Sequence, residues 1–380
     1  MDTRITDLLP ELIRLRHEFH QIPEIAGKEF KTSALIRQEL QKLPLEIREP
    51  LIGTDVVAIL DTGRPGRNLL LRADMDALPI AEETGKDYAS THPGMMHACG
   101  HDGHVTMLLG AAKYLCSIRE QLSGTIKFVF QPGEEVEAMG RKLVEAGVLQ
   151  NPPADRVSAI HGWPGLPKGA VCCREGAFMA SAAHFYITIT GRGGHGSAPA
   201  LAIDPVVAAA QAICALQTIV SRNTDPRETA VLSICTLEAG HGSNVIPDEV
   251  KLSGTTRALT PEIADGLEAK IRRVLAGVCA ATETSYEMDY HALYQVSMND
   301  PQAVAEVRRA AQMAGLQYVD LPKPDMAAED FSYYLAKCPG AMIFLGLGED
   351  YTKLHRNTFD FDDDVLANGV AYLVHLVTGA

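Results

Sequence analysis

Several side chains able to bind a metal ion or move a proton stand shortly after short apolar segments of this sequence. The segments read as buried strands, and the polar residues that follow them are Asp74, Asp76, Glu134, Glu135, His161 and His355. A second group, Cys99, His101 and His104, stands at the beginning of an apolar helical pattern. In open α/β sheets ligands bind outside the carboxyl ends of the strands, so we expect these residues to converge in one crevice.

The residue types in this set suit a pair of transition-metal ions. Thiolate and imidazole select borderline-soft metals, and carboxylates add negative charge and can bridge two ions. Two metal ions polarise a scissile carbonyl and acidify a bound water, while a nearby unligated carboxylate takes the proton. The adjacent Glu134 and Glu135 could divide these tasks, one as base and one as ligand.

Each group also has a structural interpretation on its own. Cys99 could be a core residue, residues 101–104 a polar helix start, and the Glu134–Glu135 pair part of an exposed loop. The shared position after strands favours the functional interpretation. Five other histidines, His17, His20, His92, His241 and His291, lack this support, and we interpret them as structural or surface residues.

The elements that position these residues alternate between strand and helix patterns. We expect helices at 12–19, 32–43, 104–119 and 301–314, and strands at 56–60, 68–72, 125–130, 157–160 and 341–345. Asp102 is a candidate N-cap of the third helix. Strands interleaved with helices predict an α/β fold with a mostly parallel sheet.

The pattern changes at residue 183 and returns near residue 293. Strands at 185–190, 230–236, 249–257 and 285–290 and helices at 205–218 and 261–280 give a β-α-β-β-α-β order. This order predicts a small open sheet with helices on one face, as in ferredoxin-like folds. A chain of 380 residues usually forms more than one domain. We therefore predict a catalytic domain of residues 1–182 and 293–380, with an inserted α+β domain of residues 183–292.

Composition limits the partners. A net charge of -14 argues against binding to nucleic acid, which depends on Lys and Arg neutralising phosphates. The first residues lack the pattern of a signal peptide, and no apolar run approaches ~18 residues, so we expect a cytoplasmic protein with no membrane partner. The eight cysteines form no regular framework, and we expect thiols.

Motifs along nearly the whole chain resemble the M20 metallopeptidase family, in its branch of N-acyl-amino-acid amidohydrolases. This branch includes hippurate hydrolases and indole-3-acetyl-amino-acid hydrolases. The motifs are L-R-H-E-F-H-Q-I-P at 15–23, R-A-D-M-D-A-L-P at 72–79, M-H-A-C-G-H-D-G-H at 96–104, F-Q-P-G-E-E at 130–135, G-R-G-G-H-G-S-A-P at 191–199, S-N-V-I-P at 243–247, A-E-D-F at 328–331 and L-H-R at 354–356.

The resemblance implies roles for individual residues. Two divalent ions, Mn²⁺ or Zn²⁺, would be bound by Cys99 as the bridge and by His101, Glu135, His161 and His355. Glu134 would be the general base, and Asp76 would support the site from behind the ligands.

The resemblance also implies roles for the inserted domain, as a lid and a homodimer surface. His195 would reach the partner's active site and stabilise the oxyanion, and Asn244 and Arg257 would hold the substrate carboxylate. Two positions depart from the family pattern: Ala183 replaces a frequent Asp, and Ala200 replaces a frequent His.

The function predicted from these observations is hydrolysis of the amide bond of a small N-acyl amino acid to a carboxylic acid and a free amino acid. A dipeptidase or carboxypeptidase with the same two-metal chemistry is the nearest alternative. A non-catalytic binding protein with two lobes is a second alternative, which the intact set of ligands and base disfavours.

Overall fold

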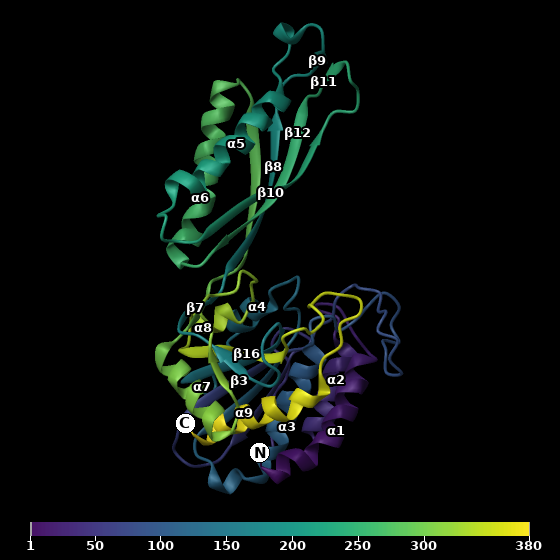
Figure 1. The fold of residues 1–380 in the computed structure, drawn as a ribbon, viewed down its shortest axis with the longest axis vertical. Coiled ribbons are helices and arrows are strands. Elements are labelled where there is room, and N and C mark those ends of the chain that lie inside the picture. Colours follow the sequence, from purple (N-terminus) through teal and green to yellow (C-terminus); the bar gives the residue numbers. More distant parts are fainter. Residues whose placement is uncertain (1, 380) are drawn as a thin grey trace. The chain divides into compact units, whose positions relative to one another are not determined.

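The computed structural model describes residues 2–379, which form two compact units (Figure 1). Unit 1 contains the chain up to Phe178, the segment Ser297–Lys323 and the chain from Asp330 onward. Unit 2 contains Met179–Val296 and Pro324–Glu329.

Unit 2 is slightly larger than the inserted domain that the sequence suggests. Its first long strand begins at Ser181 and its last ends at Tyr294, just outside the bounds 183 and 292 placed from the sequence. The short segment 324–329 belongs to it because Met179 forms a parallel β-bridge with Asp325.

A sheet of eight strands forms the centre of unit 1. In spatial order its strands are β1 (Glu46–Ile47), β2 (Val56–Asp61), β4 (Thr125–Gln131), β3 (Asn68–Asp74), β5 (Arg156–Pro164), β16 (Gly340–Gly348), β6 (Val171–Cys173) and β15 (Tyr318–Asp320). The four strands β4, β3, β5 and β16 are parallel neighbours. The prediction of a mostly parallel α/β sheet is confirmed, and all five predicted strands are present. β16 is buried along almost its whole length, as expected for an apolar strand covered on both faces.

Seven α-helices lie in the described part of unit 1. They are α1 (Thr3–His20), α2 (Phe30–Leu40), α3 (His101–Ser117), α4 (Met139–Glu145), α7 (Pro301–Met313), α8 (Ser332–Leu335) and α9 (Leu366–Thr378). α3 packs against α1, α9 and β3, with Leu108 and Leu109 in the main core (Figure 1). Burying each such side chain contributes about 1.5–3 kcal/mol. Helix α9 was not predicted from the sequence; it is apolar on nearly every side, and most of its residues are buried.

The beginning of α3 differs from the expectation. Asp102 was expected as the N-cap, but Gly100 occupies that position in a left-handed conformation with φ 84°. A Cβ atom at Gly100 would lie 2.9 Å from Phe361, so both the backbone conformation and the space require glycine. Asp102 lies inside the first turn, and its side chain instead faces Arg16 and His20.

Unit 2 contains an antiparallel sheet of four strands in the order β10 (Ala230–Ala239), β12 (Glu249–Ala258), β8 (Ser181–Thr190) and β13 (Ser285–Tyr294). Two helices, α5 (Pro205–Asn223) and α6 (Pro261–Ala281), share one apolar core with one face of this sheet. The chain order is the predicted β-α-β-β-α-β order. A two-stranded sheet in unit 2 pairs β9 (Gly194–His195) with β11 (Val245–Ile246). A second one pairs β7 (Gly176–Met179) with β14 (Ser297–Asn299) and lies in unit 1 except for Met179.

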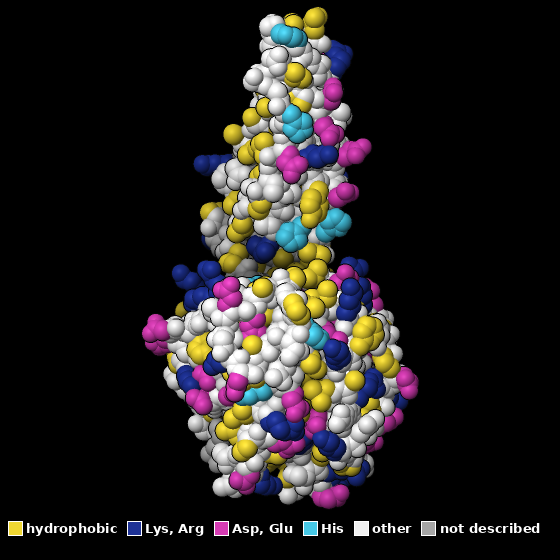
Figure 2. All heavy atoms as spheres, turned by 90° about the vertical axis from the view of Figure 1, so that its right-hand side faces the viewer, with side chains coloured by type: hydrophobic (Ala, Val, Ile, Leu, Met, Phe, Trp, Pro, Cys, Tyr) yellow, Lys and Arg dark blue, Asp and Glu magenta, His cyan; other side chains and the backbone are white. Residues whose placement is uncertain are grey.

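One helix among the described residues, α5, is long and apolar enough to cross a membrane by length and composition alone. Its buried residues, among them Ala212, Leu216 and Ile219, belong to the core between the helices and sheet of unit 2. About a third of this apolar stretch is buried, while Val206 and Val207 near its beginning are exposed. On the face drawn in Figure 2, acidic and basic side chains are interspersed and form no single large basic patch.

Candidate metal centre

The polar residues that follow the strands of unit 1 converge as the topology predicts. Asp74 ends β3, His161 lies within the last part of β5, and the loop after β4 carries Glu134 and Glu135. The ends of β3 and β4 are joined by a hydrogen bond from the Met75 amide to the Gln131 carbonyl, at 3.0 Å. The strand ends and the beginning of α3 therefore bring residues distant in sequence to one place.

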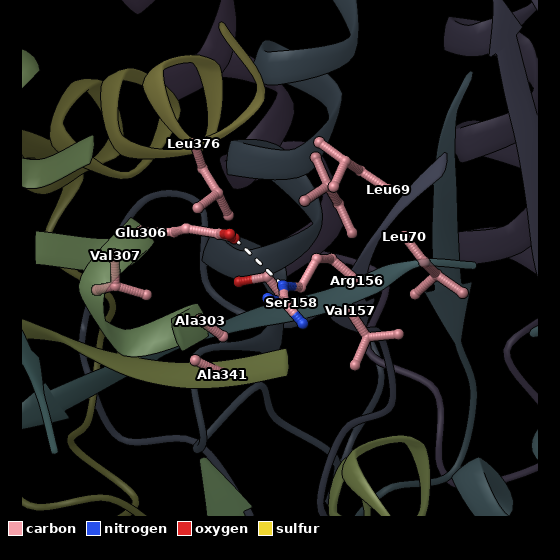
Figure 3. Close-up of a pocket in the computed structure, with 11 residues that line it drawn as sticks. Leu69, Leu70, Arg156, Val157, Ser158, Ala303, Glu306, Val307, Ala341 and Leu376 are labelled. Carbon is pink, nitrogen blue, oxygen red and sulfur yellow. Dashed lines mark hydrogen bonds and ion pairs between the residues drawn. The ribbon is translucent and has the colours of Figure 1, made fainter. Parts of the chain in front are cut away.

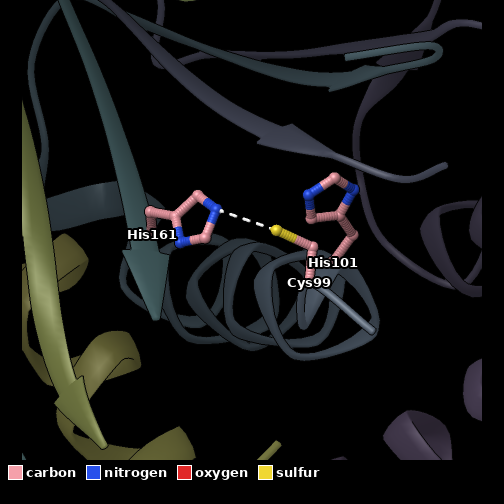
Figure 4. Close-up of side chains that lie close together, drawn as sticks. All are labelled: Cys99, His101 and His161. Carbon is pink, nitrogen blue, oxygen red and sulfur yellow. Dashed lines mark hydrogen bonds between the residues drawn. The ribbon is translucent and has the colours of Figure 1, made fainter. Parts of the chain in front are cut away.

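The Cys99 thiol lies at the centre of this group. Its Sγ is 3.5 Å from Nε2 of His161 and 3.3 Å from Nε2 of His355. Two triads of possible ligands share this sulfur: Cys99 with His101 and His161, and Cys99 with Glu135 and His355. Within each triad the ligand atoms lie within 4.8 Å of one another. Figure 4 shows the first triad, with the thiol between the two imidazoles.

Hydrogen bonds fix which ring nitrogens face this sulfur. His101 donates from Nδ1 to the backbone carbonyl of Asp76 at 2.9 Å, and His161 donates from Nδ1 to the Gly162 carbonyl at 2.8 Å. When each ring is neutral, its Nε2 therefore carries the lone pair, which is the form that binds metal. His101 Nε2 and Glu135 Oε1 are buried, and neither has a hydrogen-bond partner among the described residues.

His355 completes the group from the far end of the sequence. Its backbone has φ 62°, a left-handed conformation that is uncommon outside glycine and often marks a functional position. Its amide donates to the Ala98 carbonyl at 2.8 Å, and its Nε2 lies 3.2 Å from Oε1 of Glu135. The backbone strain thus accompanies an imidazole held against both Cys99 and Glu135.

Asp76 lies behind the ligands. Its Oδ2 accepts a hydrogen bond from the Glu135 amide at 3.0 Å, and its Oδ1 lies 3.2 Å from Nδ1 of His101. One buried carboxylate therefore contacts two of the candidate ligand residues. This arrangement is the one expected for a residue that orients ligands.

The charges around this group favour cations. Burial raises the pKa of the Cys99 thiol well above its usual range, and the carboxylates of Glu135 and Glu134 raise it further. Burial opposes a positive charge on His101, but neighbouring carboxylates, Asp74 first among them, outweigh it and raise the pKa to about 10. The buried carboxylates thus favour positive charge beside them, and the donor set fits zinc or another borderline-soft ion.

A network beneath the ligands was not assigned by the sequence analysis. The fully buried Arg72 donates to Asp74 at 2.6 Å, to Asp330 at 2.7 Å and to Gln131 at 3.0 Å. Asp330 also accepts from the Gly140 amide at 2.7 Å. Arg72 and Asp330 both stand in motifs shared with the M20 family, at 72–79 and 328–331, and this was the only indication of a role in the sequence. Neither has the position expected of a metal ligand or a base.

This network continues to both sides of the ligand group. His104 is hydrogen-bonded to Asp74 at 2.6 Å and accepts from the Gly162 amide at 2.8 Å, beside His161. On the other side the amide of Asp330 approaches Oε1 of the buried Glu134 at 3.4 Å. Glu134 lies beside the candidate ligands His101 and Glu135, and the Asp330 amide contacts its carboxylate.

Three further residues predicted for the site lie in unit 2. His195 pairs with Val245 in the β9–β11 ladder, and the amide of Gly196 donates to the Asn244 carbonyl at 2.8 Å, so His195 and Asn244 are neighbours. Arg257 lies on the sheet face opposite the helices and donates to the Thr256 carbonyl at 2.9 Å. Its half-buried guanidinium forms no ion pair with a described carboxylate.

A small cavity in the core of unit 1 does not compete with this centre. It lies between β3, β5, α7 and β16 and has a volume of about 20 Å³, room for roughly one water molecule (Figure 3). Its lining is mainly apolar, with Arg156 and Glu306 paired at 3.3 Å on one side. It is too small for an organic substrate.

Comparisons with known proteins agree with the geometry. The family model described as Peptidase family M20/M25/M40 matches residues 70–379. The chain is 38% identical over 377 residues to hippurate hydrolase of Campylobacter jejuni, covering 98% of this chain and 97% of that protein. It is 36% identical over 366 residues to thermostable carboxypeptidase 1 of Saccharolobus solfataricus, covering 94% and 92%. A crystal structure from Bacillus subtilis, described as a dinuclear metal binding peptidase from the M20 family, is 33% identical, with a TM-score of 0.86 and 98% of both chains covered.

Proposed function

Because this chain belongs to peptidase family M20/M25/M40, we propose that it hydrolyses the amide bond of N-acyl amino acids with the help of two divalent metal ions. The relative from Campylobacter jejuni is named for hippurate, which is an N-acyl amino acid, and it covers nearly the whole chain. The products are a carboxylic acid and a free amino acid.

One observation carries the proposal: two triads of ligand atoms share the Cys99 sulfur, and the buried Glu134 lies beside them. We propose Cys99 as the bridge, with His101, Glu135, His161 and His355 as the other ligands. The proposed ions are Mn²⁺ or Zn²⁺, since thiolate, imidazole and carboxylate together suit either ion. Asp76 orients His101 and Glu135 through the contacts described above.

When bound, the two ions polarise the amide carbonyl and lower the pKa of water. The chain's own residues move the protons. Glu134 takes a proton from the attacking water, and the same carboxyl then gives it to the nitrogen of the leaving amino acid. His195 donates a hydrogen bond to the oxyanion as the carbonyl carbon becomes tetrahedral. Asn244 and Arg257 bind the substrate carboxylate, and the Arg257 guanidinium, which has no ion pair with a described carboxylate, supports this role.

The test replaces the base and keeps the metal. We expect Glu134→Gln to lower kcat by about 10²–10⁴-fold, because this is the usual contribution of a general base. The metal content after dialysis, measured by elemental analysis, should equal that of the wild type. Glu137→Gln is the matched control, since Glu137 lies in the same loop with a half-exposed side chain paired with Lys142. A Glu134→Gln variant with near-normal turnover contradicts the proposed base.

A carboxypeptidase is the second candidate, and the Saccharolobus solfataricus relative favours it. The two activities share the chemistry and differ in the group on the substrate's amino side. Assays should compare acetyl, benzoyl and indoleacetyl amino acids with dipeptides of the same carboxyl-terminal residue. A kcat/KM higher for dipeptides in every pair would replace our assignment.

We also propose that the active form is a cytoplasmic homodimer in which His195 acts on the active site of the partner. The eight cysteines are all free thiols, which suits a reducing compartment. Mixing inactive Glu134→Gln and His195→Ala subunits should restore activity in hybrid dimers. A monomer with full activity at assay concentration contradicts this arrangement.

A further inference from the structure

The motif L-R-H-E-F-H at residues 15–20 has no part in the mechanism above, although it stands among the most polar stretches of α1. Arg16 and His20 are four residues apart and therefore lie on one face of the helix. Both side chains are fully buried, which is unusual for an arginine and a histidine. This burial requires partners that repay the loss of water.

The guanidinium of Arg16 is surrounded by three carboxylates from two distant segments. Its Nη1 lies 3.2 Å from Asp102 and 2.8 Å from Asp360, and its Nε lies 2.5 Å from Asp363. The planar guanidinium also stacks on the ring of Tyr88, with 4.7 Å between its central carbon and the ring centroid. Arginine suits this position because its rigid fork can contact several carboxylates at once.

The two segments that Arg16 connects are the ones that carry candidate ligands from opposite ends of the chain. Asp102 directly follows His101 in the first turn of α3. Asp360 and Asp363 follow His355 in the segment before α9, where Asp363 begins a short 3₁₀ helix. Arg16 therefore connects the segment that carries His101 with the segment that carries His355. These two histidines belong to the two different triads that share Cys99.

Neighbouring residues restrict this junction further. His20 is hydrogen-bonded to Asp102 at 2.8 Å and lies 3.2 Å from Glu82. On the other segment, Tyr88 donates to Asp360 at 2.6 Å. The ring of His17 stacks on Tyr88 at 3.6 Å and its Nε2 lies 2.8 Å from Asp363. Each of the three carboxylates that contact Arg16 is therefore also held by a second side chain.

We propose that Arg16 is a positioning residue that sets the distance between the His101 and His355 segments and thereby increases the affinity of the metal centre. The proposal depends on the metal site of the proposed function. Loss of such a supporting contact typically lowers metal affinity by about 10–100-fold. The effect should appear in metal binding itself, because Arg16 does not contact the ligand atoms.

The experiment measures how tightly the metal-free full-length protein binds each ion. The dissociation constant for Zn²⁺ is measured by competition with a chromogenic chelator, and that for Mn²⁺ by the electron paramagnetic resonance signal of the free ion. We expect Arg16→Met to weaken binding at least 10-fold, the low end of the usual range for a supporting residue. Arg16→Lys should recover only part of this loss, since one ammonium cannot contact both segments as the guanidinium does. If Arg16→Met does not fold, Asp360→Asn tests the same idea. It weakens the contact between Arg16 and the His355 segment and leaves the contact between Arg16 and Asp102 intact.

Lys113→Met is the matched control. Lys113 also connects α1 to α3, through ion pairs with Glu11 and with Glu39 of α2, but it lies three turns away from His101. This variant should lower the midpoint of thermal unfolding and leave both dissociation constants within about threefold of wild type.

Three outcomes separate the claims. A wild-type protein that binds neither ion contradicts the proposed function. A wild type that binds, together with folded Arg16→Met or Asp360→Asn variants of unchanged affinity, contradicts the role of Arg16. If Lys113→Met weakens metal binding as much as Arg16→Met, the effect is one of general stability and the proposal is wrong.

Discussion

Asp330→Asn tests the network beneath the metal centre, because the carboxylate is fully buried and both of its oxygens accept hydrogen bonds. Oδ1 accepts from Arg72 at 2.7 Å and from Gln131 at 2.8 Å. Oδ2 accepts from Gln131 and from the Gly140 amide, each at 2.7 Å. Asparagine keeps one acceptor and turns the other into a donor.

The cost follows from these contacts. If the amide oxygen keeps the position facing Arg72, its NH₂ group faces the N–H of Gly140, and one buried donor is left unpaired at a cost of about 1–3 kcal/mol. The contact with the guanidinium also loses its charge-assisted strength, about 1 kcal/mol more. Arg72 still has Asp74 at 2.6 Å, so it does not become an isolated buried charge. We therefore expect the free energy of unfolding to fall by about 2–4 kcal/mol.

The assay is urea unfolding of the metal-free protein at pH 7, followed by the fluorescence of Trp163. This residue is the single tryptophan of the sequence, and it lies on β5 with its ring stacked on Phe344, so it reports on unit 1. Asp364→Asn, at a side chain that is 78% exposed, is the control and should change the unfolding free energy by less than about 1 kcal/mol. A loss below 1 kcal/mol for Asp330→Asn would show that the network does not depend on this charge.

Two further predictions concern protons and metal. Burial opposes a charge on His20, but its hydrogen bonds to Asp102 and Glu82 outweigh burial and raise its pKa from 6.5 to about 9. The protonated His20 stabilises the folded protein by about 3 kcal/mol below pH 6.5, and this stabilisation is lost as the pH rises through 9. The difference in unfolding free energy between wild type and His20→Gln should therefore shrink over that range. A difference that stays constant contradicts the prediction. Adding Zn²⁺ or Mn²⁺ at 100 times Kd should stabilise unit 1 by about 2.7 kcal/mol. It should also change the fluorescence of Trp163, whose ring lies 5.3 Å from that of His161. An unchanged unfolding midpoint would count against a metal site there.

The sequence predicted the fold well where pattern and burial agree. The strands at 125–130 and 341–345 were visible because parallel strands covered on both faces are continuous apolar runs, and they correspond to β4 and β16. The β-α-β-β-α-β order of unit 2 was visible because each element has its own periodicity. Helix α9 was missed because a helix buried on nearly all sides lacks the polar stripe that reveals amphipathic helices.

For the candidate site, the sequence indicated which residues follow strands but not which polar residues support them. Asp102 was interpreted as a helix cap, yet it pairs with Arg16, 86 positions earlier in the chain. Nothing local to either residue encodes that contact, since it depends on how α1 packs against α3. The same holds for Asp330, whose partner Arg72 is 258 positions away. Buried ion pairs between distant segments become visible only in the folded chain.

The place of β16 in the sheet has a consequence for the order of events during synthesis. This strand comes from residues 340–348 but lies between β5 and β6, which are translated far earlier. Until it emerges from the ribosome, β5 keeps an unpaired edge, while unit 2 up to Val296 is already complete except for its short segment 324–329. His355 emerges later still. The inserted unit can therefore form before the sheet of unit 1 is complete, and the proposed set of metal ligands is assembled only after His355 has emerged.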